Sequence, residues 1–144
     1  MTGTFDFETV KTIRENRQIV RHVELDLAIT LNTREQLSRS CLQKRVHEFE
    51  RRLNKKIFGK NWRQRKKRIN WIHNYEHTSG NSHSHSVCML EGVEAKAVKR
   101  HARQIWANLN KGKSQAQLWA DTITNPNATA IYITKDGDMD TTPV

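Results

Sequence analysis

The chain has 144 residues, and its 25 Lys and Arg against 15 Asp and Glu give a net charge of +10. This length fits one domain with a core of its own. With 35% hydrophobic and 28% charged residues, the composition is that of a soluble protein and excludes a collagen or a coiled-coil rod. No stretch approaches the roughly eighteen apolar residues of a membrane span, and the N-terminus lacks a signal-peptide pattern, so we expect an intracellular protein with no membrane partner.

The positive charge is concentrated in residues 44–68. This window holds twelve Lys and Arg and two Glu, an excess of ten that equals the net charge of the whole chain. Such a patch attracts a polyanion and gains affinity by releasing counterions, so nucleic acid is the expected partner, the alternative being a solvated helix face. Trp62 lies inside the window, where we favour a role as a core anchor over stacking on a base.

The first half of the chain predicts a strand and then a long helix. Residues 1–22 are assigned to an N-terminal helix or extension. Residues 24–32 alternate apolar and polar side chains, which predicts a strand. Thr33 and Gln36 have the spacing of a capping box, and apolar residues then recur every three or four positions as far as Gly59. The two cysteines, Cys41 and Cys88, have no CxxC spacing and are interpreted as small buried hydrophobes.

The second half predicts a hairpin, a helix, a strand and a last helix. The hairpin comprises strands over 68–77 and 82–90, joined by a turn that contains Gly80. A helix over 93–110 and a strand over 115–123 follow, and Asn125 with Pro126 has the pattern of a helix start. We therefore expect one α+β domain over residues 1–144, with a central antiparallel sheet flanked by helices.

His83 and His85 are the strongest candidates for chemistry. They are two residues apart in a predicted strand, so both imidazoles project from one face and can share a metal ion. The hairpin brings Glu76 alongside them, with His77 and His73 as alternatives. Two imidazoles and one carboxylate leave coordination positions open for water and a phosphate oxygen, as in a catalytic site, and Mg²⁺ or Mn²⁺ suits phosphate chemistry.

Tyr132 and Lys135 form a second candidate pair. On a helix their spacing places the phenol and the ammonium on one face, whereas on a strand they face opposite sides. A phenolate can attack a phosphodiester that a cation polarises. The alternative is a core tyrosine beside a surface lysine.

Three blocks in this order resemble the HUH superfamily of single-stranded DNA endonucleases, specifically the rolling-circle replication initiators, or Rep proteins. AITLN at 28–32 is similar to the first motif of that family, HSH at 83–85 to the His-x-His metal motif, and YITK at 132–135 to the tyrosine motif. The resemblance covers residues 24–136. Two features depart from the pattern: Ser84 replaces a bulky apolar residue, and no GxxxxGK[ST] loop follows.

The resemblance implies a concrete reaction. A metal ion held by Glu76, His83 and His85 orients a phosphate of single-stranded DNA or an origin hairpin, Tyr132 attacks it to leave a 5′-phosphotyrosine, and Lys135 assists. A separate helicase and replication machinery are implied as partners, in the cytoplasm or nucleoid of a prokaryote or in the nucleus for a eukaryotic virus. Thr30 and Asn32 of the first motif are implied to help hold the DNA, and the basic window adds Lys55, Lys56, Lys60, Arg63, Arg65, Lys66, Lys67 and Arg68.

Two other functions stay open. A single-tyrosine transposase of the same superfamily has the same order of motifs, although the TLN block and Lys135 favour a Rep protein. A relaxase fits less well, because there the tyrosine precedes the histidines. From a different class, a non-catalytic basic nucleic-acid-binding module would leave the histidines structural and Tyr132 in the core.

Overall fold

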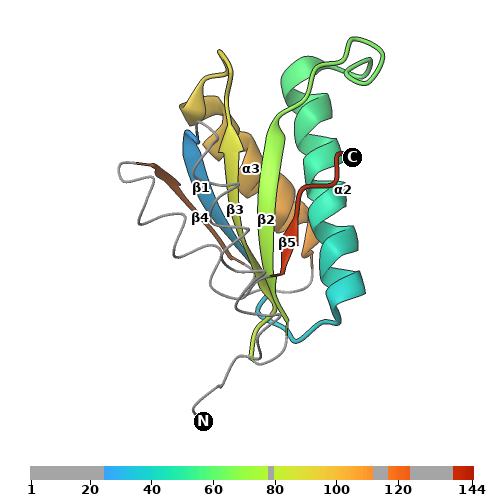
Figure 1. Cartoon of the computed structure of the whole chain (residues 1–144), viewed down its shortest axis with the longest axis vertical. Helices are drawn as coiled ribbons and strands as arrows, with labels where there is room; N and C mark the ends of the chain where they lie inside the picture. The colour runs from blue at the N-terminus through green and yellow to red at the C-terminus, as the bar shows by residue number, and fades with distance from the viewer. Residues whose placement is uncertain (1–24, 78–79, 112–116, 124–137) are drawn as a thin grey trace, which may run out of the picture.

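The computed structural model describes residues 25–77, 80–111, 117–123 and 138–144. In this part of the chain the elements are β1 (Leu27–Asn32), α2 (Arg39–Phe58), β2 (Asn70–Glu76), β3 (His83–Met89), α3 (Ala95–Leu109), β4 (Gln117–Thr122) and β5 (Met139–Asp140) (Figure 1). The strands form one sheet in the order β4-β1-β3-β2-β5, and all neighbours are antiparallel. The predicted α+β class is confirmed. Neither described helix has the length and apolarity to cross a membrane.

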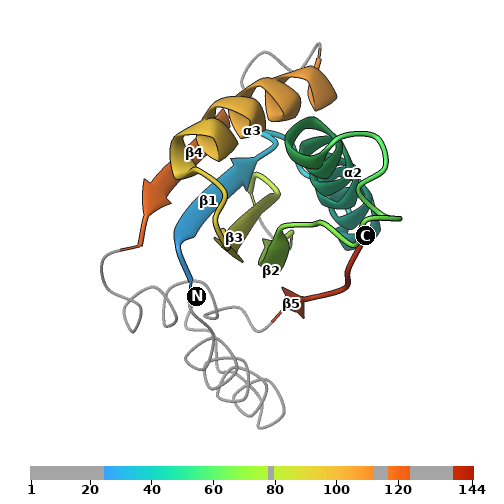
Figure 2. The same ribbon diagram turned by 90° about the horizontal axis from the view of Figure 1, so that it is seen from above.

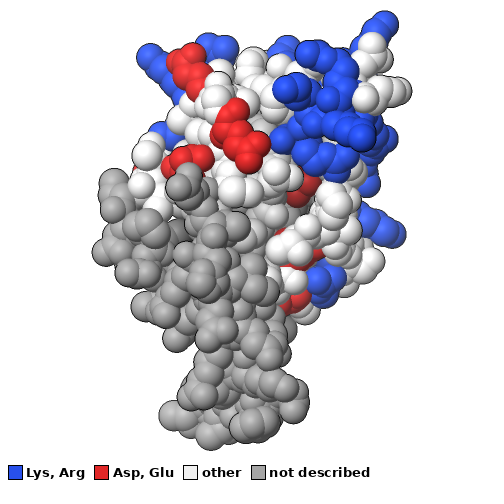
Figure 3. Space-filling view, turned by 45° about the horizontal axis from the view of Figure 1, so that its top comes forward, with Lys and Arg blue, Asp and Glu red and all other residues white. Residues whose placement is uncertain are grey.

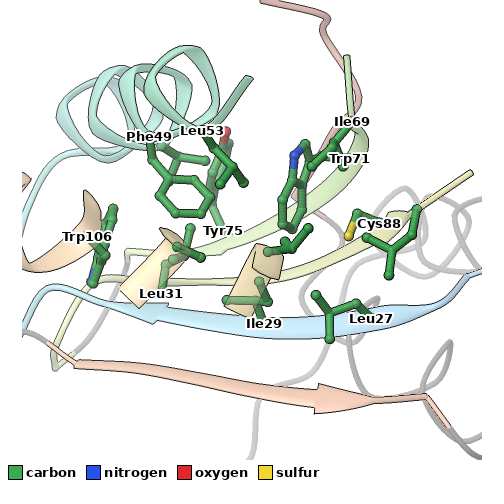
Figure 4. Packing of buried hydrophobic residues seen from close by; sticks show 14 of the residues in the cluster. Leu27, Ile29, Leu31, Phe49, Leu53, Ile69, Trp71, Tyr75, Cys88 and Trp106 are labelled. Atoms are coloured by element: carbon green, nitrogen blue, oxygen red, sulfur yellow. The ribbon is translucent and has the colours of Figure 1, made fainter. Parts of the chain in front are cut away.

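The main core lies between the sheet and the two described helices, which cover the same face of the sheet (Figure 2). Phe49 of α2 contacts Trp71 of β2 and Trp106 of α3 edge-on, with ring centroids 5.8 and 5.9 Å apart (Figure 4). The alternation of β1 places its leucines and isoleucine in this core. The core residues on β1, α2 and α3 are Leu27, Ile29, Leu31, Leu42, Val46, Phe49, Leu53, Val98, Ala102 and Trp106.

The opposite face of the sheet has a small apolar cluster at one end. Ile72 and Val87 are buried there, with Ala28 and Met139 packed against them. Because side chains alternate along a strand, the residues two and four positions before Val87 share its face. These residues are His85 and His83, so the candidate ligands project away from the helices.

Two local predictions are wrong. Helix α2 begins at Arg39 with Ser38 as its N-cap, whose Oγ accepts a hydrogen bond from the Cys41 N–H at 3.2 Å. Thr33 is not a cap, because its hydroxyl donates instead to the carbonyl of Ser82 at 2.6 Å. Cys41 is exposed, whereas Cys88 is buried as predicted. The expected N-terminal helix or extension over 1–22 and the helix after Asn125 lie outside the described residues.

The short strand β5 was not predicted, and one carboxylate anchors it. Asp140 is buried and accepts hydrogen bonds from the Tyr75 hydroxyl at 2.5 Å and from the Gln43 amide at 3.1 Å, and His47 lies 2.8 Å away. Burial alone raises the pKa of Asp140, but the hydrogen bonds from Tyr75, from Thr142 and from Gln43 outweigh it, so the pKa falls well below its ordinary value.

This depressed pKa predicts how stability depends on pH. Because Asp140 has a lower pKa in the folded than in the unfolded chain, its contribution is present above about pH 4 and is lost as the pH falls further. We expect Asp140→Asn to lower the free energy of unfolding by about 2 kcal/mol at pH 6. The difference in unfolding free energy between the variant and the wild type should shrink as the pH falls. Urea denaturation from pH 6 to pH 2 measures this. Asp121→Asn, an exposed residue on the edge strand β4, is the control. A difference from wild type that stays constant with pH would contradict the prediction.

Candidate metal centre and basic surface

The β2–β3 hairpin brings three potential metal ligands together. In its antiparallel register Glu76 pairs with His83, and Asn74 pairs with His85. Directly paired residues share a face of the sheet, so Glu76 and both imidazoles project from the face opposite the two described helices. In the turn, Gly80 has a φ of 69°, a left-handed conformation that a residue without a Cβ adopts at little cost. The predicted triad of Glu76, His83 and His85 is thus brought together.

The distances within this triad fit a shared ion. Nε2 of His83 lies 2.9 Å from Oε2 of Glu76 and 3.1 Å from Nε2 of His85, and one ligand atom of each residue lies within 4.8 Å of the others. Ligands bound at about 2.1 Å on neighbouring positions of one metal ion are about 3.0 to 3.4 Å apart. The two shortest contacts therefore match the edges of a coordination polyhedron.

The hydrogen bonds of the two rings orient their Nε2 atoms. Nδ1 of His83 lies 2.8 Å from the carbonyl of Asn81, which can only accept, so Nδ1 carries a proton and Nε2 points toward Glu76 and His85. Nδ1 of His85 faces the Thr30 hydroxyl at 3.5 Å. Such outer partners fix the tautomer of metal-binding histidines. A cation bound there would be held by Glu76 and by the Nε2 atoms of His83 and His85.

Asn74 supplies a further observation that fits a bound ion. Its side chain is buried, and within the described part of the chain neither its amide nitrogen nor its oxygen has a hydrogen-bond partner. An orphaned buried amide costs about 1–3 kcal/mol. Asn74 pairs directly with His85 and lies two residues before Glu76, on the same face of the sheet. An oxygen of a water or phosphate on the ion would supply the missing partner.

A chain of hydrogen bonds lies on the side of β3 opposite the candidate ligands. On the helix-facing side of β3, Ser84 Oγ lies 2.8 Å from Ser86 Oγ, which lies 2.7 Å from Nδ1 of His73. Nε2 of His73 in turn bonds the buried carboxylate of Glu50 on α2. The ring of His73 is stacked between those of Trp71 and Tyr75. Ser84 therefore belongs to a buried polar network that joins β3 to β2 and α2.

The two alternative histidines have other partners. His77 lies next to Glu76 in sequence, but its Nε2 is 3.0 Å from a carboxylate oxygen of Asp138. His73 is buried on the helix-facing side, as described above. Asn32 of the first motif accepts a hydrogen bond from the Arg34 N–H at 2.8 Å and so shapes the turn that follows β1. Tyr132 and Lys135 lie outside the described residues.

The basic surface lies at the other end of β2 from the metal ligands. Figure 3 shows Lys and Arg side chains gathered at one corner, and Figure 1 shows the loop between α2 and β2 at that end of the molecule. Trp62 is only 6% exposed, and the guanidinium groups of Arg63 and Arg68 lie over its ring at 4.7 and 5.4 Å. It therefore anchors the loop and offers no free face to a base. The exposed cations of this surface are Lys55, Lys56, Lys60, Arg63, Arg65, Lys66 and Lys67, whereas Arg68 is half-buried and bonds the carbonyl of Val144.

Two elements of the site were missed at the sequence level. Asn74 belongs to no motif. The sequence indicates only that it is a polar residue two positions before Glu76, on the same face of the strand. Glu50 had a clearer signal, because it follows Phe49 directly and precedes Leu53 by three residues on an apolar helix face. A lone acid in that position indicates a buried partner.

Comparison of the chain with protein-family models, with curated proteins and with solved structures finds no match.

The triad predicts metal binding that can be measured without activity. Mn²⁺ should raise the melting temperature of the full chain by several degrees, since an ion that binds only the folded state stabilises it. His85→Ala should abolish this rise and weaken Mn²⁺ binding in calorimetry by at least tenfold. His77→Ala is the matched control and should keep both effects. Equal Mn²⁺ affinity in the His85→Ala variant and the wild type would contradict the assignment.

The buried pair of Glu50 and His73 predicts a large effect of mutation on stability. Glu50→Ala should lower the free energy of unfolding by about 3 kcal/mol or more, because it leaves His73 without its partner in the core. Glu48→Ala is the control on the same helix. Its partially exposed carboxylate lies 3.8 Å from Arg51, and such surface pairs contribute at most about 1 kcal/mol. Similar urea midpoints for the two variants would show that the Glu50–His73 pair does not stabilise the fold.

Proposed function

We propose that the chain is a metal-dependent endonuclease that nicks and rejoins single-stranded DNA and initiates rolling-circle replication. The observation that carries the proposal is the convergence of Glu76, His83 and His85 on the face of the hairpin opposite α2 and α3. A divalent ion held there supplies a Lewis acid that orients and polarises a phosphate. Two imidazoles with one carboxylate favour Mn²⁺ over Mg²⁺, which prefers an all-oxygen shell.

The two tyrosines of the chain differ in their fitness as nucleophiles. Tyr75 is buried in the core, its hydroxyl donates to Asp140, and burial followed by that contact raises its pKa well above the ordinary value. A phenolate there is strongly disfavoured, and no phosphate reaches it. The proposal therefore assigns the nucleophile to Tyr132.

The proposed step is an in-line transfer of a phosphoryl group to Tyr132, and it needs no oxidant or reductant. The phenol of Tyr132 loses its proton to solvent or a base, and its oxygen forms a bond to phosphorus. The bond from phosphorus to the 3′ oxygen breaks, and that oxygen takes up a proton to become a free 3′-OH. The 5′-phosphotyrosine keeps the energy of the ester, so that a 3′-OH can reverse the step and rejoin the strand. Lys135 is assigned to stabilise the charge of the transition state.

The basic surface is assigned to DNA on either side of the cleaved bond. The seven residues of β2 separate it from the metal ligands by about 20 Å, at roughly 3.3 Å per residue. Contacts from Lys and Arg to phosphates position a duplex or strand without reading its sequence. The proposed partners are thus single-stranded DNA or an origin hairpin, with strand separation left to a separate helicase.

The proposed reaction leaves a product that a denaturing gel detects. The full chain is incubated with a mixed pool of single-stranded oligonucleotides and Mn²⁺, and we expect a band of protein that carries DNA. The band should disappear with EDTA and in Tyr132→Phe. Tyr75→Phe is the matched control, which should keep the adduct because that residue is remote from DNA.

Two results would overturn the proposal. An adduct that persists in Tyr132→Phe would place the nucleophile elsewhere. Absence of an adduct, with binding that stays tight at low salt and weakens steeply with added salt, would identify a non-catalytic binding module.

A further inference from the structure

One large apolar side chain is exposed on the same face as the candidate metal site. Trp119 of β4 is 49% exposed and is the one exposed large hydrophobic residue in the described part of the chain. The other three tryptophans of the chain are at most 6% exposed. A surface tryptophan loses contact with water on binding a flat apolar partner, so its exposure marks a candidate contact.

The register of the sheet places this ring in line with the metal ligands. Trp119 pairs with Thr30 across β4 and β1, and Thr30 pairs with His85 across β1 and β3. The three residues form one row on one face, and the strand spacing of about 4.8 Å puts the backbone of Trp119 about 10 Å from that of His85. Trp119 is therefore on the surface that a strand bound at the metal site would cross.

A cation is held over the exposed ring. The guanidinium of Arg34 lies 5.9 Å from the ring centroid, and its Nη2 donates to Oε1 of Gln117 at 2.6 Å. Arg34 has a φ of 57°, which costs a residue with a Cβ about 1–2 kcal/mol, and the side chain of Asn32 holds this turn by accepting from the Arg34 N–H. Within the described residues no carboxylate lies within ion-pair distance of Arg34. The cation is thus available to a phosphate beside the ring.

We propose that Trp119 and Arg34 form a nucleotide-binding subsite for single-stranded DNA, in which a base stacks on the indole and Arg34 contacts the adjoining phosphate. The occupant follows from the combination of an exposed π face, a cation with no carboxylate partner among the described residues and a nearby candidate metal site for phosphate. A base inside a duplex is already stacked on both sides and cannot lie on the ring, so the subsite favours single strands. This inference rests on the proposed function for its choice of substrate.

Intrinsic fluorescence tests the subsite directly, because the other three tryptophans are buried. The full chain in EDTA is titrated with (dT)12 and, separately, with a blunt 12-base-pair duplex. We expect (dT)12 to quench the emission and the duplex to leave it nearly unchanged. Trp119→Leu should remove the quenching and weaken (dT)12 binding about tenfold in fluorescence anisotropy, with the melting temperature unchanged. Trp119→Phe, which keeps a π face, should retain most of the affinity.

The controls separate this subsite from the basic surface and from catalysis. Lys67→Ala should weaken (dT)12 and duplex binding alike, whereas Trp119→Leu should affect (dT)12 alone. Because EDTA is present, the result does not depend on whether a phosphotyrosine forms. Equal (dT)12 affinity in the Trp119→Leu variant and the wild type would overturn the inference. So would a shift of Trp119→Leu from dimer to monomer in sedimentation with DNA affinity intact, which would make this face a contact between two copies of the chain.

Discussion

The candidate site depends on the register in which β2 pairs with β3. A slip of one residue would turn both imidazoles toward the core and bring serines to the opposite face. Ser82, which directly precedes β3, fixes the start of that strand against the loop between β1 and α2. Its N–H donates to the Glu35 carbonyl, its carbonyl accepts from the N–H and hydroxyl of Thr33, and its hydroxyl both donates to and accepts from the backbone of Leu37. Thr33 thus helps to position the candidate metal ligands, because it bonds the residue that directly precedes their strand.

The register gives the two faces of β3 different tasks. The face opposite α2 and α3 carries the candidate ligands His83 and His85, while the helix-facing side carries Ser84 and Ser86, bonded through His73 to Glu50. A buried polar network stabilises a unique arrangement only when its members are satisfied, and it costs more than apolar packing when they are not. Here the bonds run without interruption from β3 to α2. The network therefore joins β3 to α2 through side-chain hydrogen bonds.

The sequence predicts the fold well where side-chain period and turn chemistry agree. The alternation of β1, the hairpin around Gly80 and the apolar stripes of α2 and α3 are confirmed to within a few residues. The start of α2 was wrong because Thr33 satisfies a tertiary partner, Ser82, which local pattern cannot reveal. β5 was missed because two residues carry no period, and its place depends on the buried contacts of Asp140.

The same distinction applies to the candidate site. The spacing of His83 and His85 predicts a shared face from strand geometry alone, and the turn places Glu76 opposite them. Asn74 and Trp119 gave no signal, because each matters through cross-strand neighbours that are distant in sequence. Trp62 illustrates the converse: its position in a basic run is compatible with stacking, but only packing shows that two guanidinium groups enclose it.

The basic surface and the candidate metal ligands are far apart, and in the proposed function this distance affects how the protein would select DNA. The basic surface and the metal ligands lie at opposite ends of β2, about 20 Å apart, which corresponds to about six base pairs of duplex at 3.4 Å each. In the proposed function, affinity from the basic surface would fall with salt and depend little on strandedness, because it would be a sum of phosphate contacts. The sheet face opposite α2 and α3 would have the reverse character, since an ion, an exposed indole and one cation would engage a few nucleotides in a defined geometry. Discrimination between single strand and duplex would then belong to this sheet face, and the basic loop would raise the local concentration of either.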